Sequence, residues 1–233
     1  MGLTEYRRKR RFEKTPEPSG DREPRRRGKA LGYVVQKHRA TALHYDFRLE
    51  WKGVLLSWAV PKGPSLDPSV KRLAMQTEDH PLAYATFEGI IPEGEYGGGT
   101  VMVWDRGTWT PEVPDVDAAL RKGELKFALR GKKLGGSWVL VRTRGGPSGK
   151  TAWLLIKHRD AFASDEDIAT TQPRSVASKR ILAEIAWQEG GNVEKAATGD
   201  PEGEIRRLLA NPRTAAKKKR GKPAVWHSNR ALS

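Results

Sequence analysis

One nine-residue segment, Leu43–Trp51, alternates strictly between apolar and polar side chains, and it is the strongest constraint on the fold. Successive side chains of a β-strand point to opposite faces of the sheet, so a period of two predicts a strand. One face would carry only apolar and aromatic groups: Leu43, Tyr45, Phe47, Leu49 and Trp51. The other would carry four ionisable groups: His44, Asp46, Arg48 and Glu50. A chain with this strand needs a hydrophobic core on one side of it only.

Short strand-like segments punctuated by glycine and proline recur throughout residues 31–160, and Lys52-Gly53 predicts a hairpin turn after the first alternating strand. The other predicted strands are 31–36, 54–60, 100–104 with a continuation through a turn at Gly107 to Trp109, 124–129, 137–142 and 151–157. One short helix is expected at 116–122. This pattern indicates an all-β domain, either a barrel or a sandwich.

Charge divides the chain into three parts. The 233 residues carry 43 Lys and Arg against 28 Asp and Glu, a net charge of +15, of which the 31–160 segment contributes only +5. We expect a basic, partly disordered arm at 1–30, the β domain at 31–160 and an extension at 161–233. The extension would hold one amphipathic helix near 178–189 and a basic disordered tail. The basic runs at 25–27 and 217–220 are either solvated or bind phosphates.

Composition excludes several classes of function. The chain has no cysteine, which excludes disulfides, thiol catalysis and cysteine-based zinc sites. It has no apolar run of about 18 residues that would span a membrane, and its first residues do not resemble a secretory signal. A metal site would therefore use histidine, carboxylate or backbone oxygen ligands. The excess of positive charge predicts a polyanionic partner, most simply nucleic acid.

The polar face of the alternating strand has the composition of a metal site. His44 and Asp46, two residues apart, place a nitrogen and an oxygen ligand on one side of the strand, which suits a divalent transition metal. His38 can reach the same place if the chain bends between the two histidines, and Arg48 can bind a phosphoryl oxygen. The alternative is a half-exposed strand whose polar face is simply solvated.

Two further sequence features each allow two interpretations. His80 lies in the polar cluster Thr77–Pro81, where it either joins the site or is a surface loop histidine. The glycine-rich stretches at 61–65 and 94–100 lack the spacing of a phosphate-binding loop and are more consistent with turns. Lys62, in the first of these stretches, is available as a phosphate contact.

At these residues the sequence resembles the 3′-phosphoesterase domain of bacterial DNA ligase D, in its stand-alone form. The resemblance runs from about Tyr6 to Asp160. It is carried by Gln36-Lys37-His38, Leu43–Glu50, Ser57–Ser65, Lys71–Ala74, Glu78–Pro81, Tyr84 with Phe87–Gly89, Ile91-Pro92 with Gly94 and Tyr96-Gly97, and by Thr15–Pro18 in the arm.

The resemblance implies a compact antiparallel β-barrel, closed or partly open, with an active-site groove on its surface. It implies a Mn²⁺-dependent phosphodiesterase and phosphomonoesterase that removes 3′-terminal ribonucleosides and 3′-phosphates and leaves a 3′-OH for repair or end joining. Other divalent transition metals are alternatives. The implied metal ligands are His38, His44 and Asp46, and the implied phosphate-binding residues are Arg48, His80 and Tyr84. The implied supporting residues are Gln36, Lys62, Arg72 and Glu78, together with Arg10 and Glu17 in the arm.

The sequence departs from the resemblance at Arg11, where the family commonly has aspartate, and this departure concerns the diesterase activity more than the phosphatase activity. The implied partners are DNA or DNA/RNA 3′ ends, with Ku and a separate ligase or polymerase as candidates, in a cytoplasmic, nucleoid-associated setting. Two alternatives remain: a catalytically weak DNA-binding accessory module of a ligase system, and a metal phosphoesterase acting on RNA ends.

Overall fold

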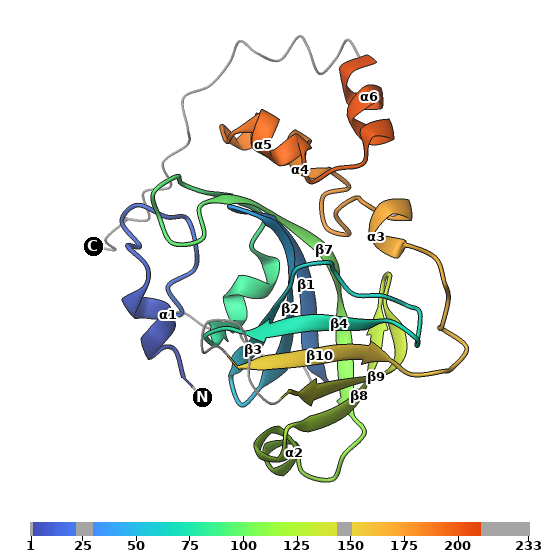
Figure 1. Ribbon diagram of the computed structural model, residues 1–233. Coiled ribbons are helices and arrows are strands. Elements are labelled where there is room, and N and C mark those ends of the chain that lie inside the picture. Colours follow the sequence, from blue (N-terminus) through green and yellow to red (C-terminus); the bar gives the residue numbers. More distant parts are fainter. Residues whose placement is uncertain (1, 22–29, 144–150, 211–233) are drawn as a thin grey trace.

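A closed antiparallel barrel is the centre of the computed structural model, which describes residues 2–21, 30–143 and 151–210 (Figure 1). Around the ring, the strands of this described part are β1 Leu31–Arg39, β2 Leu43–Trp51, β3 Val54–Val60, β4 Lys71–Gln76, β10 Ala152–Lys157, β9 Gly135–Arg142, β8 Glu124–Gly131 and β7 Gly99–Pro111. Antiparallel pairing of β1 with β7 closes the ring. Two short strands lie beside it: β5 His80–Pro81 pairs with β3, and β6 Gly89–Ile91 pairs with β7.

The predicted all-β barrel is confirmed. Strands β2 and β3 have the predicted bounds, and the predicted helix is α2 Val116–Lys122, whose N-terminus is capped by the Asp115 carboxylate. The remaining helices are α1 Thr4–Arg8, the 3₁₀ helix η1 Leu82–Thr86, α3 Ile168–Thr171, α4 Leu182–Glu189, α5 Val193–Ala197 and α6 Glu202–Ala210. Strands β4, β5 and β6 were not predicted, because none of them shows a sustained alternation of apolar and polar residues.

The turn predicted at Gly107 is wrong. Gly107 lies inside the long strand β7, paired with Tyr33 of β1 and Gly131 of β8. A Cβ atom at this position would lie 2.0 Å from the backbone oxygen of Arg130, so glycine permits a close approach of two strands here. Gly107 therefore allows two strands to approach closely and does not form a turn.

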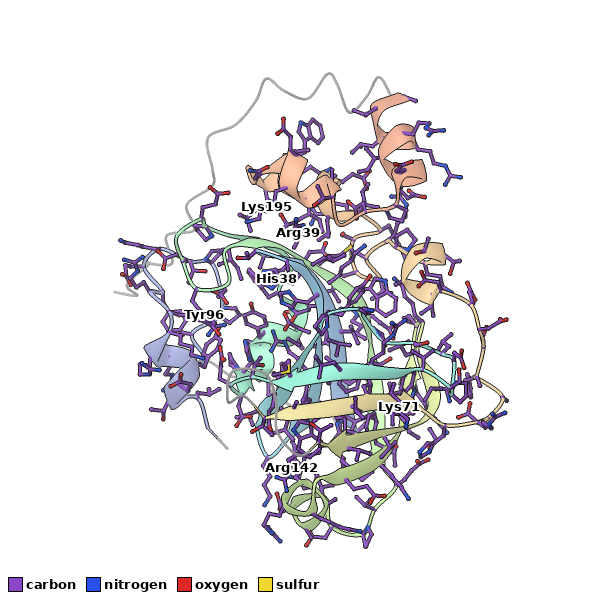
Figure 2. The ribbon with its side chains drawn as sticks, viewed as in Figure 1. His38, Arg39, Lys71, Tyr96, Arg142 and Lys195 are labelled. Atoms are coloured by element: carbon purple, nitrogen blue, oxygen red, sulfur yellow. The ribbon has the colours of Figure 1, made fainter. Side chains whose placement is uncertain are left out.

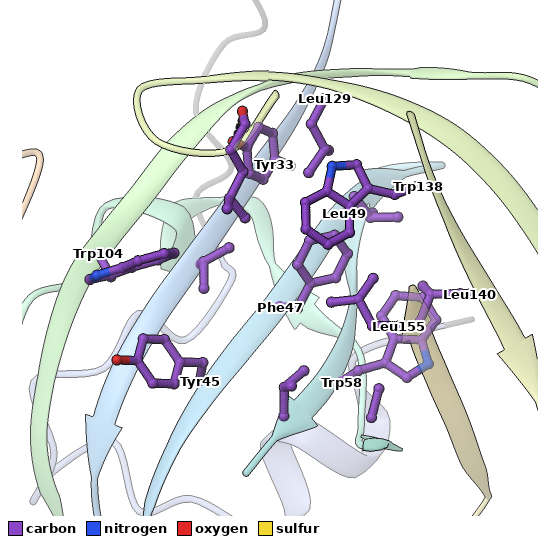
Figure 3. Packing of buried hydrophobic residues seen from close by; sticks show 14 of the residues in the cluster. Tyr33, Tyr45, Phe47, Leu49, Trp58, Trp104, Leu129, Trp138, Leu140 and Leu155 are labelled. Atoms are coloured by element: carbon purple, nitrogen blue, oxygen red, sulfur yellow. Dashed lines mark hydrogen bonds between the residues drawn. The ribbon is translucent and has the colours of Figure 1, made fainter. Parts of the chain in front are cut away.

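The barrel interior is filled by large aromatic side chains, as Figure 3 shows for the apolar face of β2 and its neighbours. Phe47 packs against Trp58 and Phe127, with ring centroids 6.5 and 5.8 Å apart. Trp58 and Trp138 are 0% and 1% exposed. Because this face of β2 is sealed inside the barrel, its ionisable face must point outward.

The segment after the barrel covers part of its outer surface. Helix α4 begins at Leu182, four residues later than expected, and buries Leu182, Ile185 and Ala186 over β6 and β7 (Figure 1). A buried ion pair, Lys37 to Asp200 at 3.7 Å, also joins β1 to this segment.

The basic runs expected at 25–27 and 217–220 lie outside the described residues. Every helix in the described ranges is too short or too polar to cross a lipid bilayer.

Asp105 ties the β8–β9 hairpin to the rest of the barrel. Its carboxylate is completely buried and accepts hydrogen bonds at 3.0 Å from the backbone N–H groups of Lys132, Lys133 and Leu134. The Tyr33 hydroxyl donates a fourth bond at 2.6 Å. A buried carboxylate is tolerated when its lone pairs are satisfied in this way.

We expect Asp105→Ala to lower the free energy of unfolding by about 3 kcal/mol, because three backbone N–H groups, that of Leu134 buried and those of Lys132 and Lys133 part-buried, lose their acceptor together with the Tyr33 hydroxyl. The change is measured as a shift in the urea midpoint. Asp115→Ala, which removes the exposed cap of α2, is the matched control and should cost only about 1 kcal/mol. Equal losses in the two variants would contradict this role for Asp105.

Candidate functional site

Strands β1 and β2 bring the three predicted metal ligands together on the outer face of the barrel. His38 lies opposite His44 in the antiparallel register, and Asp46 is the next outward residue of β2. The Asp46 Oδ2 atom lies 3.5 Å from His38 Nδ1 and 3.7 Å from His44 Nε2. One ligand atom from each residue lies within 4.8 Å of the others, a spacing that allows a shared metal ion.

Hydrogen bonds to backbone carbonyls orient both imidazoles for metal binding. His38 Nε2 lies 2.8 Å from the Gly97 oxygen, and His44 Nδ1 lies 3.1 Å from the Ala42 oxygen. Only an N–H can donate to a carbonyl, so we assign the ring protons to these two nitrogens. The lone pairs of His38 Nδ1 and His44 Nε2 then face Asp46, as in histidine ligands held by an outer carbonyl.

The charge states of these side chains also suit a metal ion. Burial alone would raise the pKa of Asp46, but attraction to Arg48, and then to His44 and His38, holds that pKa far below its usual range. Burial lowers the pKa of His44 despite the nearby carboxylate. At neutral pH the carboxylate is therefore charged and the His44 imidazole is neutral, which are the forms that bind metal.

Arg48 follows on the same row of β2 and is fixed by a ring of hydrogen bonds. Its Nε donates to Gln36 at 2.9 Å and its Nη1 to Ser57 at 2.7 Å, while Nη2 lies 3.3 Å from Asp46. The residue is 2% exposed. The alternative of a simply solvated polar face therefore does not hold for Asp46 and Arg48. The guanidinium is held beside the candidate metal ligands with its Nη2 end toward them.

His80 lies between two guanidinium groups. Arg10 Nη2 is 3.2 Å from His80 Nε2, and Arg48 Nη1 is 2.9 Å from His80 Nδ1, which also lies 2.8 Å from the Glu78 backbone oxygen. Burial and the two positive neighbours lower the pKa of His80 well below its usual value. The Tyr84 ring stacks edge-on at 4.8 Å. His80 is thus a neutral, buried group that separates the two arginines.

The N-terminal segment completes the cluster. Arg10 forms ion pairs with Glu17 at 2.8 Å and with Glu78 at 3.1 Å, and all three side chains are at most 5% exposed. Glu17 also accepts a 2.9 Å hydrogen bond from the Tyr84 hydroxyl. Residues far apart in the chain therefore form one continuous network from Glu17 to His44.

Two predicted site residues lie elsewhere. Lys62 and Arg72 line a cavity of about 430 Å³ together with Lys37 and Tyr45, whose side chains point to the opposite face of β1 and β2 from Asp46. Among the described residues, no hydrogen bond or ion pair joins Lys62 or Arg72 to the metal-ligand cluster. The phosphate contact predicted for Lys62 and the supporting role predicted for Arg72 therefore stay predictions.

Some members of the network were not predicted. Ser57 lies opposite Arg48 in the β2–β3 hairpin. The predicted turn at 52–53 sets the pairing of the two strands, so it could have identified Ser57 as the neighbour of Arg48. Lys9, which lies 3.1 Å from Glu78, left no such signal, because nothing in the sequence fixes where the arm packs. Arg11, at the position of the departure noted above, pairs with Glu95 at 2.6 Å and is half-exposed.

The ion pairs of Arg10 predict a large effect on stability. Arg10→Ala should lower the free energy of unfolding by about 3–5 kcal/mol at pH 7, because it removes the guanidinium that pairs with the buried carboxylate of Glu17 and leaves Glu78 paired with Lys9 alone. Arg11→Ala, which removes an exposed pair, is the control and should cost less than about 1 kcal/mol. Chemical denaturation measures both.

The Arg10→Ala effect should also depend on pH. Burial raises the pKa of Glu78, but hydrogen bonds from its own backbone, Lys9 and Arg10 outweigh it, so the folded-state pKa lies below the usual value. The stability that this group contributes is present above its unfolded pKa and is lost as the pH falls through the folded one. The difference in the free energy of unfolding between wild type and Arg10→Ala should therefore become smaller below about pH 4. A difference that stays constant down to pH 3 would contradict this explanation.

Comparison with known proteins gives one consistent family. A family model described as the DNA ligase D 3′-phosphoesterase domain matches residues 36–142. The chain is 57% identical over 186 residues to the multifunctional non-homologous end joining protein LigD of Pseudomonas aeruginosa, which covers 77% of this chain and 22% of that protein. It is 50% identical over 143 residues to the corresponding DNA repair protein of Mycobacterium tuberculosis, covering 61% of this chain and 18% of that one.

The chain therefore spans about a fifth of the length of these curated relatives. The matched region begins at Gln36 within β1 and includes β2, β3 and β5, so it contains the metal-ligand cluster, Arg48 and His80. Together with the barrel and the geometry of its outer face, these matches show that the chain belongs to the family of DNA ligase D 3′-phosphoesterase domains.

Proposed function

We propose that this protein is a metal-dependent 3′-phosphoesterase that removes 3′-terminal ribonucleosides and 3′-phosphates from DNA and leaves a 3′-OH for repair or end joining. The observation that carries the proposal is the outward row of β2. Two imidazole nitrogens and one carboxylate oxygen lie within 4.8 Å of one another, and the Arg48 guanidinium is 3.3 Å from that carboxylate. A site for a cation beside a fixed guanidinium suits a phosphate ester.

The residues present fit a divalent metal ion. His38, His44 and Asp46 would hold it, with the two imidazoles oriented by the Gly97 and Ala42 carbonyls. Two nitrogen ligands and one oxygen ligand favour a first-row transition metal over calcium or magnesium, and we propose Mn²⁺. When bound, the metal would supply Lewis-acid polarisation of a phosphate oxygen.

Arg48 is the residue of this chain best placed to bind the phosphate itself. Gln36 and Ser57 hold Nε and Nη1, so the guanidinium needs no reorganisation to present Nη2 beside the metal ligands. A fixed donor of this kind stabilises negative charge as it develops on the phosphate oxygens. We propose that the site's positive charge is supplied mainly by Arg48.

We propose supporting roles for the residues behind Arg48. His80 is 3% exposed and Tyr84 is 2% exposed, and both pack against the guanidinium, with the Tyr84 ring centroid 4.9 Å from Arg48 Cζ. Because both side chains are buried, we propose that they position the Arg48 guanidinium. Arg10 and Glu17 would position His80 and Tyr84 from the other side.

The biological setting is proposed from the relatives. Their names describe multifunctional proteins of non-homologous end joining. We propose that this chain acts on DNA or DNA/RNA 3′ ends in the same process, in the cytoplasm at the nucleoid, with Ku and a ligase or polymerase as partners. An accessory DNA-binding role and an action on RNA ends are the competing functions.

One assay separates these functions. Labelled DNA and RNA strands with a 3′-phosphate or a 3′-terminal ribonucleotide are incubated with Mn²⁺, or with EDTA. We expect metal-dependent processing of the DNA ends. An absence of turnover would indicate an accessory module, and a preference for the RNA strand would indicate the RNA-end alternative.

His44→Ala and Asp46→Ala should each abolish both reactions, because each removes a metal ligand. Mn²⁺ binding, measured by isothermal titration calorimetry, should be lost in parallel. His158→Ala is the matched control, because this histidine follows β10 and is hydrogen-bonded to Ser137 rather than to the cluster. Full activity in either ligand variant would disprove the assignment.

Arg48→Ala should separate phosphate binding from metal binding. We expect turnover to fall by about 10²–10³-fold, the usual effect of removing one fixed donor to a developing anion. Mn²⁺ binding should persist, because the three ligands remain. A variant that loses its metal and its activity together would show that Arg48 only maintains Asp46.

A further inference from the structure

An exposed aromatic ring lies at the edge of the site. Tyr96 is 47% exposed, whereas the other tyrosines of the chain, all of them in the described residues, are at most 3% exposed: Tyr6, Tyr33, Tyr45 and Tyr84. It lies in the loop between β6 and β7. An exposed aromatic ring offers a face on which a nucleic-acid base can stack, so the position of Tyr96 relative to the site bears on substrate binding.

Two contacts place Tyr96 at the rim of the metal-ligand cluster. The carbonyl of the next residue, Gly97, accepts the hydrogen bond from His38 at 2.8 Å. On the other side, Arg10 Cζ lies 5.5 Å and Lys9 Nζ 4.8 Å from the centre of the Tyr96 ring. Figure 2 shows Tyr96 beside His38, on the side of the barrel that helix α1 flanks.

The loop holds Tyr96 in a fixed position. Backbone hydrogen bonds link Glu95 to Pro92 at 3.2 Å and Gly98 to Glu95 at 3.0 Å. The Glu95 side chain is 9% exposed and pairs with Arg11 at 2.6 Å, which ties the loop to the arm. At Gly99, a Cβ atom would lie 2.1 Å from the backbone oxygen of Arg39, so the loop packs directly on the end of β1. A ring mounted in this way can bind a flat ligand with little loss of conformational entropy.

We propose that Tyr96 is the stacking platform for the base at the 3′ end of the substrate strand. This inference rests on the proposed function. A base stacked on Tyr96 would lie next to the loop that orients His38, so the adjoining 3′ phosphate would be near the candidate metal ligands and the Arg48 guanidinium. Base–aromatic stacking tolerates every base, which suits an enzyme that meets ends of any sequence.

The first test compares Tyr96→Ala with Tyr96→Phe. Tyr96→Ala should raise KM for a 3′-phosphate DNA strand about tenfold, with little change in kcat. A loss of this size is typical when an aromatic side chain that stacks on one base is removed. Tyr96→Phe keeps the ring, loses only the 3.4 Å contact with Lys9, and should behave as wild type. Phe162→Ala, which removes an exposed ring packed near Gly135, is the matched control and should have no effect.

The second test reads the contact directly and needs no turnover. A DNA strand with 5-iodouracil as its 3′-terminal base is irradiated with the protein in EDTA, and the cross-linked residue is identified by mass spectrometry. We expect the cross-link at Tyr96. A cross-link elsewhere, or a KM unchanged in Tyr96→Ala, overturns the stacking role even if the enzyme processes DNA ends. If the wild type processes no 3′ end in Mn²⁺, the proposed function itself fails.

Discussion

The buried charge pair of Asp46 and Arg48 is the constraint on which the rest of the site depends. Both residues are less than 10% exposed, yet they lie on the outer face of the barrel and not in its core. Charges removed from water must be paired and hydrogen-bonded, or the fold loses several kcal/mol. Gln36 and Ser57 satisfy the guanidinium, and the two histidines flank the carboxylate. The same contacts that make this burial tolerable also hold the groups in the geometry that a metal and a phosphate require.

The need to cover this face explains why the N-terminal arm packs where it does. Tyr6 is completely buried and stacks on His80 with ring centroids 4.9 Å apart, while Arg10 caps the same imidazole from its Nε2 side. Arg10 brings a positive charge into a cluster that already contains Arg48, so Glu17 and Glu78 are required to balance it. The arm therefore supplies charge compensation as well as apolar cover, and truncating it would expose and unbalance the site.

The parts of the molecule that follow from a short-range pattern could be predicted from sequence. The period of two in β2 predicted the strand and its two faces, and it placed His44, Asp46 and Arg48 in one row. Strand β4, KRLAMQ, has no such alternation, and its pairing with β10 joins segments about 80 residues apart, so only the assembled barrel reveals it. The contact of Lys9 with Glu78 failed to follow from sequence for a similar reason, because it depends on where an arm without periodicity packs.

The register between β1 and β2 links the stability of the barrel to the proposed chemistry. Because successive residues face opposite sides, a slip of one residue would turn Tyr45 and Phe47 outward and bury His44 and Asp46 inside the barrel. That register would leave two aromatic rings in water and place unpaired charges in an apolar interior, so packing of the core excludes it. The aromatic core thus selects the only pairing in which His38 meets His44 and Asp46. For this reason we regard the packing of the barrel interior as a determinant of the candidate metal site on its outer face.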